Sequence, residues 1–405
     1  MKVIILNDFA YVNGGASQVA IDTAIMLAKR GFDTCLFTAV GPVDERLKCV
    51  ENLRVVCLGQ YDILNDPSRV RAMVQGIWNR TAEERLSQLL MEYDAKTTII
   101  HVHTCQKALS CSCIWRAKHM GFKVVYHMHD YGIACPNLGF YNYRLRRICT
   151  EQAMCTGCIF SDCDARHYAH KIWRCIRQFV QNKIAGLPKD LDGYIAVSKF
   201  SYNIVKPYLG EKANVRILST PCQINTCKCI TVEKNSVFVF VGRLSSEKNP
   251  ILLAQCAKKM NVPVLFIGDG AEKEQIKKIN PNAILSGWIE RKEFYTELQN
   301  ARCLVFPSLC YETQGLVVQE MAAYGIPAIV SNATAASEYI EDGYNGLLFE
   351  SGNPASLMNC MSRLQDDAYA AYMGKNAFEK VQINKHTEKV YLEDIVSFYN
   401  EILQR

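Results

Sequence analysis

The sequence has no uninterrupted apolar run of the roughly 18 residues that a membrane-spanning helix requires. Its first residues, MKVIILNDFA, hold a single lysine and an apolar run too short for a signal peptide, so we expect a first strand there. Low-complexity tracts and repeats of about 20–50 residues are also lacking. These absences argue against a membrane-spanning chain and against a solenoid, and they predict a cytoplasmic protein.

The composition is that of a folded chain. Hydrophobic residues make up 49% and charged residues 21% of the 405 residues, which is enough for two domains with full cores. Nineteen cysteines are present. Because the cytosol keeps thiols reduced, these cysteines need a purpose other than disulfide bonds.

Positive charge is concentrated in one part of the chain. The formal net charge is +6, and residues 141–185 contain eight basic against three acidic side chains. We therefore expect one face of one domain to be basic. The eight residues are Arg144, Arg146, Arg147, Arg166, Lys171, Arg174, Arg177 and Lys183.

Short β-branched runs alternate with amphipathic stretches along the chain. Continuous apolar strands separated by helices predict parallel sheets that are covered on both faces. A stretch without periodicity, 219–236, marks the domain boundary. The predicted fold class is α/β: two doubly wound, Rossmann-like domains, 1–225 and 235–385, facing across a cleft, with a helix at 386–405 packing back toward the first. The expected strands are 2–6, 33–39, 97–103, 123–128, 193–198, 237–242, 263–268, 282–287, 303–308 and 326–331.

Residues that follow strands are the candidate site residues, because ligands bind outside the carboxyl ends of strands in open parallel sheets. Gly14 and Gly15 follow the first strand and precede a helix, so backbone amides there can approach an anion; a plain tight turn is the alternative. Gly268 ends another strand in the second half of the chain.

A strand end in the second half carries two cations. Arg243 and Lys248 follow Gly242, which closes the strand at 237–242. A fork-shaped guanidinium and an ammonium group at this place suit a diphosphate, with ordinary surface charge as the alternative.

Two glutamates flank the start of a helix in FPSLCYETQGLVVQEMAAYGIPAIVS, residues 306–331. Glu312 precedes the helix start and Glu320 lies in its second turn. Such a pair can act as general acid and base, as a clamp for sugar hydroxyls, or as surface charge. Because the two lie close together on one element near candidate phosphate-binding groups, we favour the clamp over a glycosidase-like pair.

These segments together make the chain similar to the retaining glycosyltransferases of family 4, which have the GT-B architecture. The similarity extends along nearly the full length. The matching segments are NGGAS at 13–17, HMHD at 127–130, VSKFS at 197–201, GRLSSEKN at 242–249, FIGDGAE at 266–272 and the spacing of Glu312 and Glu320.

The resemblance implies a role for each matching residue. Arg243 and Lys248 would contact the diphosphate of a nucleotide-sugar donor, Glu320 the ribose hydroxyls and Glu312 the transferred sugar. His129 would reach the sugar from the first domain. The remaining donor-binding positions would be Gly15, Gly242, Gly268, Thr313, Gln314, Gly315 and Leu316.

The chain departs from the family pattern at two places. Thr313 and Gln314 replace a pair that is usually aromatic and glycine-rich, which leaves the identity of the sugar open. A DCD triplet at 162–164 could bind a metal in another glycosyltransferase architecture, but here it lies in the wrong domain and is interpreted as coincidence. We expect transfer to need no divalent metal, because positive side chains and helix ends offset the leaving diphosphate.

A cysteine-rich insert spans 135–163. Cys155 and Cys158 have the C-x2-C spacing of structural zinc sites, and other thiols are near in sequence. One hypothesis is a structural zinc ion; the alternative is plain reduced thiols. The candidate ligands are Cys135, Cys149, Cys155, Cys158 and Cys163.

A helical pattern follows the insert. Its basic residues, Arg166, His170, Arg174 and Arg177, are expected to form a stripe beside an apolar one. This helix could dock on anionic lipid or hold a lipid-diphosphate acceptor, or it could be a core helix with a solvated face. The apolar residues are Ile172, Trp173, Ile176, Phe179, Val180 and Ile184.

The sequence thus predicts a retaining, metal-independent glycosyltransferase of cell-surface polysaccharide synthesis. Its partners would be a nucleoside-diphosphate sugar and a glycan or lipid-linked oligosaccharide acceptor, with peripheral contact at the inner face of an anionic membrane. Nucleic acid is not expected, because the basic region lacks a known reading module. The alternatives are a nucleotide-sugar hydrolase or epimerase of the same fold and a non-catalytic subunit that binds the sugar nucleotide.

Overall fold

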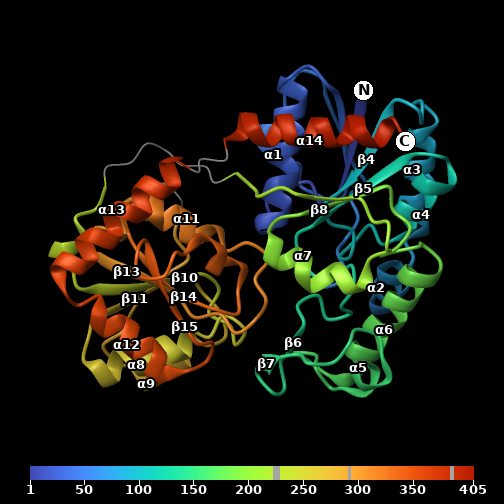
Figure 1. The fold of residues 1–405 in the computed structure, drawn as a ribbon. Helices are drawn as coiled ribbons and strands as arrows, with labels where there is room; N and C mark the ends of the chain where they lie inside the picture. Colours follow the sequence, from blue (N-terminus) through green and yellow to red (C-terminus); the bar gives the residue numbers. More distant parts are fainter. Residues whose placement is uncertain (222–228, 291–292, 384–386) are drawn as a thin grey trace.

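The computed structural model describes residues 1–221, 229–290, 293–383 and 387–405. Two parallel sheets dominate the part of the chain within these ranges (Figure 1). The α/β prediction is therefore confirmed. The domain limits stay a prediction, because positions 225 and 386 lie outside the described residues.

The first sheet has the strand order β3-β2-β1-β4-β5-β8-β9, and all its pairings are parallel. Parallel neighbours are joined by crossover connections, which is why helices separate the strands in sequence. The strands are β1 Lys2–Phe9, β2 Asp33–Val40, β3 Leu53–Cys57, β4 Thr98–Val102, β5 Lys123–Met128, β8 Gly193–Ala196 and β9 Val215–Ile217. The helices of this half are α1 Gly15–Lys29, α2 Arg69–Ile77, α3 Arg80–Leu90, α4 Ser112–His119, α5 Thr156–Phe160, α6 Tyr168–Lys183 and α7 Lys199–Val205.

The second sheet has the order β12-β11-β10-β13-β14-β15 and is also parallel throughout. Its strands are β10 Val237–Val241, β11 Val264–Ile267, β12 Ile284–Gly287, β13 Ala301–Phe306, β14 Ala328–Ser331 and β15 Gly346–Phe349. The helices of this half are α8 Pro250–Met260, α9 Lys273–Ile279, α10 Phe294–Glu297, α11 Leu316–Ala323, α12 Pro354–Arg363 and α13 Asp367–Ile383, and α14 Glu388–Leu403 follows them in sequence.

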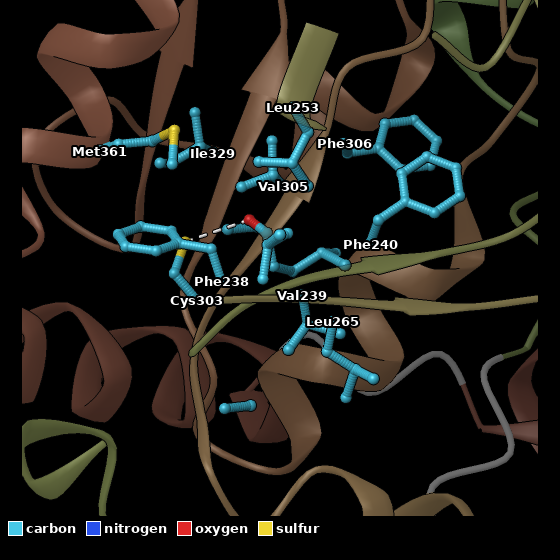
Figure 2. Close-up of a cluster of buried hydrophobic side chains, with 14 of the residues drawn as sticks. Phe238, Val239, Phe240, Leu253, Leu265, Cys303, Val305, Phe306, Ile329 and Met361 are labelled. Carbon is cyan, nitrogen blue, oxygen red and sulfur yellow. Dashed lines mark hydrogen bonds between the residues drawn. The ribbon is translucent and has the colours of Figure 1, made fainter. Parts of the chain in front are cut away.

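Each sheet is buried on both faces. In β1, Ile4 and Leu6 belong to one apolar cluster, while Val3 and Ile5 belong to another on the opposite face. This division follows from the two-residue side-chain period of a strand. In the second sheet, strand and helix side chains such as Phe238, Ile329 and Met361 form one continuous core (Figure 2).

The last helix, α14, lies on the first sheet although it follows the second one in sequence (Figure 1). Its residues Tyr391, Ile395, Phe398, Tyr399 and Ile402 are buried in the same apolar cluster as β1 and α1. The chain therefore begins and ends in the same half of the molecule.

The cysteine-rich insert holds a short antiparallel hairpin, β6 Tyr141–Asn142 and β7 Arg147–Ile148. Its side chains reach the second half of the molecule: Tyr141 donates to the carbonyl of Ser246 at 3.3 Å, and Arg146 pairs with Glu272 at 3.4 Å. The insert thus helps to fix the two sheets relative to each other.

Helix α6 is oriented differently from the sequence prediction. Arg174 and Arg177 are not on an exposed basic stripe: Arg177 is buried and donates to the carbonyl of Gln106, and Arg174 binds Asp164 at 3.0 Å. Ile176 and Phe179 are exposed instead, Phe179 by 56%. The cations turn inward because acceptors of the 130s loop and the insert lie beneath the helix.

Candidate active site between the two sheets

A pocket lies where α1, α11 and α14 meet. Three predicted donor-binding residues line it together: Gly15 from α1, and Leu316 and Glu320 from α11. Gly15 lies 301 positions before Leu316 and 305 before Glu320 in the sequence, so only the packing of the two halves brings it next to them. The full lining is Gly15, Gln18, Val19, Asp22, Thr23, Met26, Thr220, Pro221, Leu316, Glu320, Glu388 and Tyr391.

Glycines set the starts of both helices at this pocket. Gly315 caps α11 with a left-handed backbone (φ 76°), and a Cβ there would lie 2.7 Å from the Cβ of Ala336. Gly14 caps α1 with φ 97°. Because both positions favour glycine, the backbone at each helix start can approach a ligand.

Lys248 and Glu312 form an ion pair beside the start of α11. Ser308 also donates to the Glu312 carboxylate at 3.0 Å, so the carboxylate is held from two sides. Burial alone would lower the pKa of Lys248. The nearby charge of Glu312 acts in the opposite direction, and the net effect is a pKa above the ordinary value. Lys248 is therefore charged at neutral pH and offers a positive group at the end of β10.

Arg243 lies next to this pair. Its guanidinium is 3.8 Å from Glu247, and 70% of its side chain is exposed. The strand ends beneath it are in close contact: a Cβ on Gly268 would lie 2.0 Å from the Gly242 carbonyl oxygen. Gly242 and Gly268 therefore serve the close approach of two strand ends.

Thr313 and Gln314 connect the two halves of the molecule. Thr313 donates to the carbonyl of His129 at 2.9 Å, and Ser198 donates to the carbonyl of Thr313 at 2.6 Å. The Gln314 amide binds both the N–H and the carbonyl of Thr220. These two side chains thus bridge toward the first sheet, and their position does not require contact with a ligand.

His129 follows β5 and lies at this bridge. Its Nε2 is 2.9 Å from Nδ1 of His103, which follows β4. Burial lowers the pKa of His129 to about 3, so the imidazole is neutral at physiological pH. A neutral histidine can donate or accept a hydrogen bond here, but it carries no charge.

The insert cysteines do not converge as the zinc hypothesis requires. In the described ranges, three or more metal-type side chains come together only at His101, His103 and His127. Cys158 instead accepts from the buried ammonium of Lys171 at 3.4 Å. An ammonium bound to the Cys158 sulfur would repel a divalent cation at the same place, so the structure does not support a zinc site at Cys135, Cys149, Cys155, Cys158 and Cys163.

Comparison with known proteins identifies the family. The model described as "Glycosyltransferase Family 4" matches residues 13–224, which is more than half of the chain, and "Glycosyl transferases group 1" matches residues 229–380. The chain belongs to Glycosyltransferase Family 4. The family named from the sequence motifs is thereby confirmed.

Curated relatives match part of the family-4 chain. A UDP-Gal:alpha-D-GlcNAc-diphosphoundecaprenol alpha-1,3-galactosyltransferase of Escherichia coli is 28% identical over 42% of this chain and 49% of its own length. A GDP-mannose-dependent alpha-mannosyltransferase of Corynebacterium glutamicum is 33% identical over 27% of both chains. The chain spans about half the length, or less, of the curated relatives named here.

Solved structures match the family-4 chain over its whole length. Sucrose-phosphate synthase from Thermosynechococcus elongatus superimposes with a TM-score of 0.72 at 16% identity, covering 100% of both chains. HepE from Anabaena in complex with UDP gives a TM-score of 0.67 at 17% identity, covering 99% of this chain and 100% of its own. The predicted GT-B architecture, two Rossmann-like domains, is confirmed.

Three residues of this family-4 chain position the site but were not predicted. Asp8 is buried, and its carboxylate accepts hydrogen bonds from the backbone N–H groups of residues 107–109. These hydrogen bonds fix the conformation of the loop after β4. Ser198 and His103 contact Thr313 and His129. The sequence held one signal for His103: the H-x-H spacing occurs at both 101–103 and 127–129.

Proposed function

We propose that this chain is a retaining, metal-independent glycosyltransferase. It moves a sugar from a nucleoside-diphosphate sugar to a glycan or lipid-linked acceptor in cell-surface polysaccharide synthesis. The observation that carries the proposal is that Gly15, Leu316 and Glu320 line one pocket. The Lys248–Glu312 ion pair lies beside the start of α11, the helix that carries Leu316 and Glu320.

The pocket supports a division of roles among the donor-binding residues. Glu320 holds the ribose hydroxyls, since a carboxylate can accept two hydrogen bonds at once. Glu312, outside the pocket lining but paired with Lys248, holds hydroxyls of the transferred sugar. Gly15, Gly242, Gly268, Gly315 and Leu316 allow the close approach of the donor, and Thr313 and Gln314 fix the two halves around it.

The reaction needs positive charge where the diphosphate leaves. The bond between the sugar carbon and the phosphate oxygen breaks, and the acceptor oxygen bonds to the same carbon from the same face. The acceptor proton passes to the departing phosphate oxygen. Arg243 and Lys248 stabilise the negative charge that grows on this group, so no divalent ion is required. His129 is neutral and acts as a hydrogen-bond partner of the sugar.

Two measurements test the proposal. Nucleoside diphosphates bind the folded state, so the matching one among UDP, GDP and ADP should raise the melting temperature. With the matching donor sugar, release of nucleoside diphosphate should depend on added acceptor. Release without acceptor would favour a hydrolase, and binding without any release would favour the non-catalytic subunit.

The exposed surface of α2 and α6 supports a second part of the proposal, contact with a membrane. No helix in the described ranges has the length and apolar character needed to cross a bilayer. The two helices pack side by side, with Trp173 donating to the carbonyl of Met73 at 3.1 Å (Figure 1). They expose apolar side chains that we name the α2–α6 face: Val70, Met73, Val74, Ile176 and Phe179.

Charge favours an anionic bilayer as the occupant of the α2–α6 face. Neither helix contains an acidic residue, while Arg69 and Lys183 lie exposed on them. Apolar side chains that enter the interface, flanked by cations, are typical of peripheral membrane proteins. We infer that the chain works at the inner face of the membrane, where it meets a lipid-linked acceptor.

Vesicle flotation tests this contact. The protein should float with vesicles that contain anionic phospholipid, and the double variant Ile176→Glu/Phe179→Glu should lose most of this binding. The matched control is Ile284→Glu, an exposed isoleucine on β12 of the other half. Equal flotation of wild type and double variant would contradict the inference.

A further inference from the structure

Four histidines line the ends of two neighbouring strands. His101 and His103 come from β4 and the residue after it, and His127 and His129 occupy the same places on β5. Because residues two apart lie on one face of a strand, the four rings pack against each other, with ring centroids 4.1–5.3 Å apart in the cited pairs. The rings of His101, His103 and His127 are buried almost completely, with exposed fractions of 0%, 2% and 0%.

Two ring nitrogens of His101 and His103 have partners outside the group formed by His101, His103 and His127. His101 Nδ1 is 2.6 Å from the hydroxyl of Tyr399 on α14. His103 Nδ1 is 2.9 Å from His129 Nε2. Metal-bound histidines commonly have their second ring nitrogen held in this way, by a partner that fixes the ring's orientation.

Within the described part of the chain, the Nε2 atoms of His101, His103 and His127 lack comparable hydrogen-bond partners outside the group. Nε2 of His103 and Nε2 of His127 are buried and have no hydrogen-bond partner among the residues that the structure describes. His101 Nε2 has only a 3.3 Å contact with His127 Nδ1. Buried polar atoms without partners are rare in folded proteins, and each calls for an explanation such as an ion.

We propose that His101, His103 and His127 form a buried site for a divalent first-row transition ion, with zinc as the probe. One ring nitrogen from each residue lies within 4.8 Å of the other two. Tetrahedral zinc with bonds of about 2.0–2.1 Å to nitrogen needs these atoms about 3.4 Å apart. Binding of the ion therefore requires the rings to rotate so that these nitrogens come closer and the His101–His127 contact is given up.

The chemistry of the donors suits such an ion. Burial lowers the pKa of His101 to about 3 and holds those of His103 and His127 well below the ordinary value. All three rings are therefore neutral, which is the form that binds a metal. Imidazole donors favour zinc and its neighbours over magnesium or calcium, which prefer oxygen.

The site would act on His129 through His103. An ion on His103 Nε2 leaves the ring proton on Nδ1, where it donates to His129 Nε2. His129 then carries its own proton on Nδ1. The ion is structural: it orients His129 and touches no donor or acceptor, so transfer itself still needs no metal.

The test measures metal directly and does not depend on activity. Protein without an affinity histidine tag is stripped with chelator, given one equivalent of Zn²⁺ and desalted. We expect about one equivalent to remain, and X-ray absorption at the zinc edge should show a first shell of nitrogen at about 2.0–2.1 Å. His127→Phe should lower the retained zinc at least tenfold, while His119→Phe, which removes an exposed histidine on α4, should not.

Two outcomes would overturn the proposal. One is retention of less than about a tenth of an equivalent by the wild-type protein. The other is a first shell of sulfur at about 2.3 Å, because the ion would then sit on cysteines. If His127→Phe fails to fold, as judged by circular dichroism, the wild-type absorption spectrum still decides between these results.

Discussion

At the scale of single residues, Glu312 and Glu320 differ in what surrounds them. Glu320 lines the pocket with Gly15, whereas Glu312 is paired with Lys248 and held by Ser308. We predict that Glu320→Gln weakens nucleoside-diphosphate binding about tenfold to a hundredfold, the loss of charge-assisted hydrogen bonds. Glu312→Gln should lower kcat/KM by a similar factor while leaving nucleoside-diphosphate affinity nearly unchanged.

Calorimetric titration with nucleoside diphosphate and steady-state rates of transfer provide the two readouts. Glu341→Gln is a suitable control, because the Glu341 side chain is two-thirds exposed and makes a surface ion pair with Lys380 at 3.6 Å. If both site variants lose the same nucleoside-diphosphate affinity, Glu312 and Glu320 do not bind different parts of the donor.

At the scale of elements, the start of α11 positions Leu316 and Glu320, which line the pocket. Gly315 has φ 76°, and an added Cβ would lie 2.7 Å from Ala336. We predict that Gly315→Ala destabilises the protein by about 1–3 kcal/mol and shifts Glu320 enough to weaken nucleotide binding. Urea unfolding measures the first effect and calorimetric titration the second.

The control for this prediction is Gly139→Ala. Gly139 has open space where its Cβ would be, and its φ lies outside the left-handed region. This variant should unfold at the same urea concentration as the wild type. If Gly315→Ala behaves like Gly139→Ala, α11 does not need the glycine at its start, and the site is less precisely built than we infer.

Most elements were predictable from the sequence because they repeat a strong local pattern. The buried strands β1, β4, β5, β10 and β13 read as continuous apolar runs. Five strands in the described ranges were missed: β3 and β9, which are only half-buried, β15, which is short and begins with a glycine, and the two-residue strands β6 and β7 of the insert. Their pairing depends on tertiary contacts that a local pattern does not contain.

The orientation of α6 was the main error at this scale. Its apolar residues and its cations each follow helical spacing, so the sequence alone allows either set to face inward. The choice was made by distant acceptors: Asn137 and Asp164 bind Arg174, and the carbonyl of Gln106 binds Arg177. The same reason explains why the His101–His103–His127 cluster was missed, since it forms only when β4 and β5 pair.

At the scale of the whole molecule, the predicted site residues depend on how the halves are joined. Motif spacing named Gly15, Glu312, Glu320 and His129, but their mutual placement comes from the two sheets, the Thr313 and Gln314 bridges, and α14. The chain crosses back to the first sheet in α14. Helix α14 therefore belongs to the core of the first half, together with β1 and α1.

The last prediction concerns this packing. Ile402 on α14 is 1% exposed, and a Cβ on Gly193 of β8 would lie 2.4 Å from its Cδ1, which shows how closely the helix sits on the sheet. Ile402→Ala leaves a cavity there and should destabilise the first half by about 2–5 kcal/mol. Hydrogen exchange should then quicken at amides of β4 and β8 but not at those of β10 and β13.

The matched control is Ile383→Ala, at an 83% exposed position, which should change neither the stability nor the exchange rates. Equal acceleration in both sheets would mean that the two halves unfold as one cooperative unit.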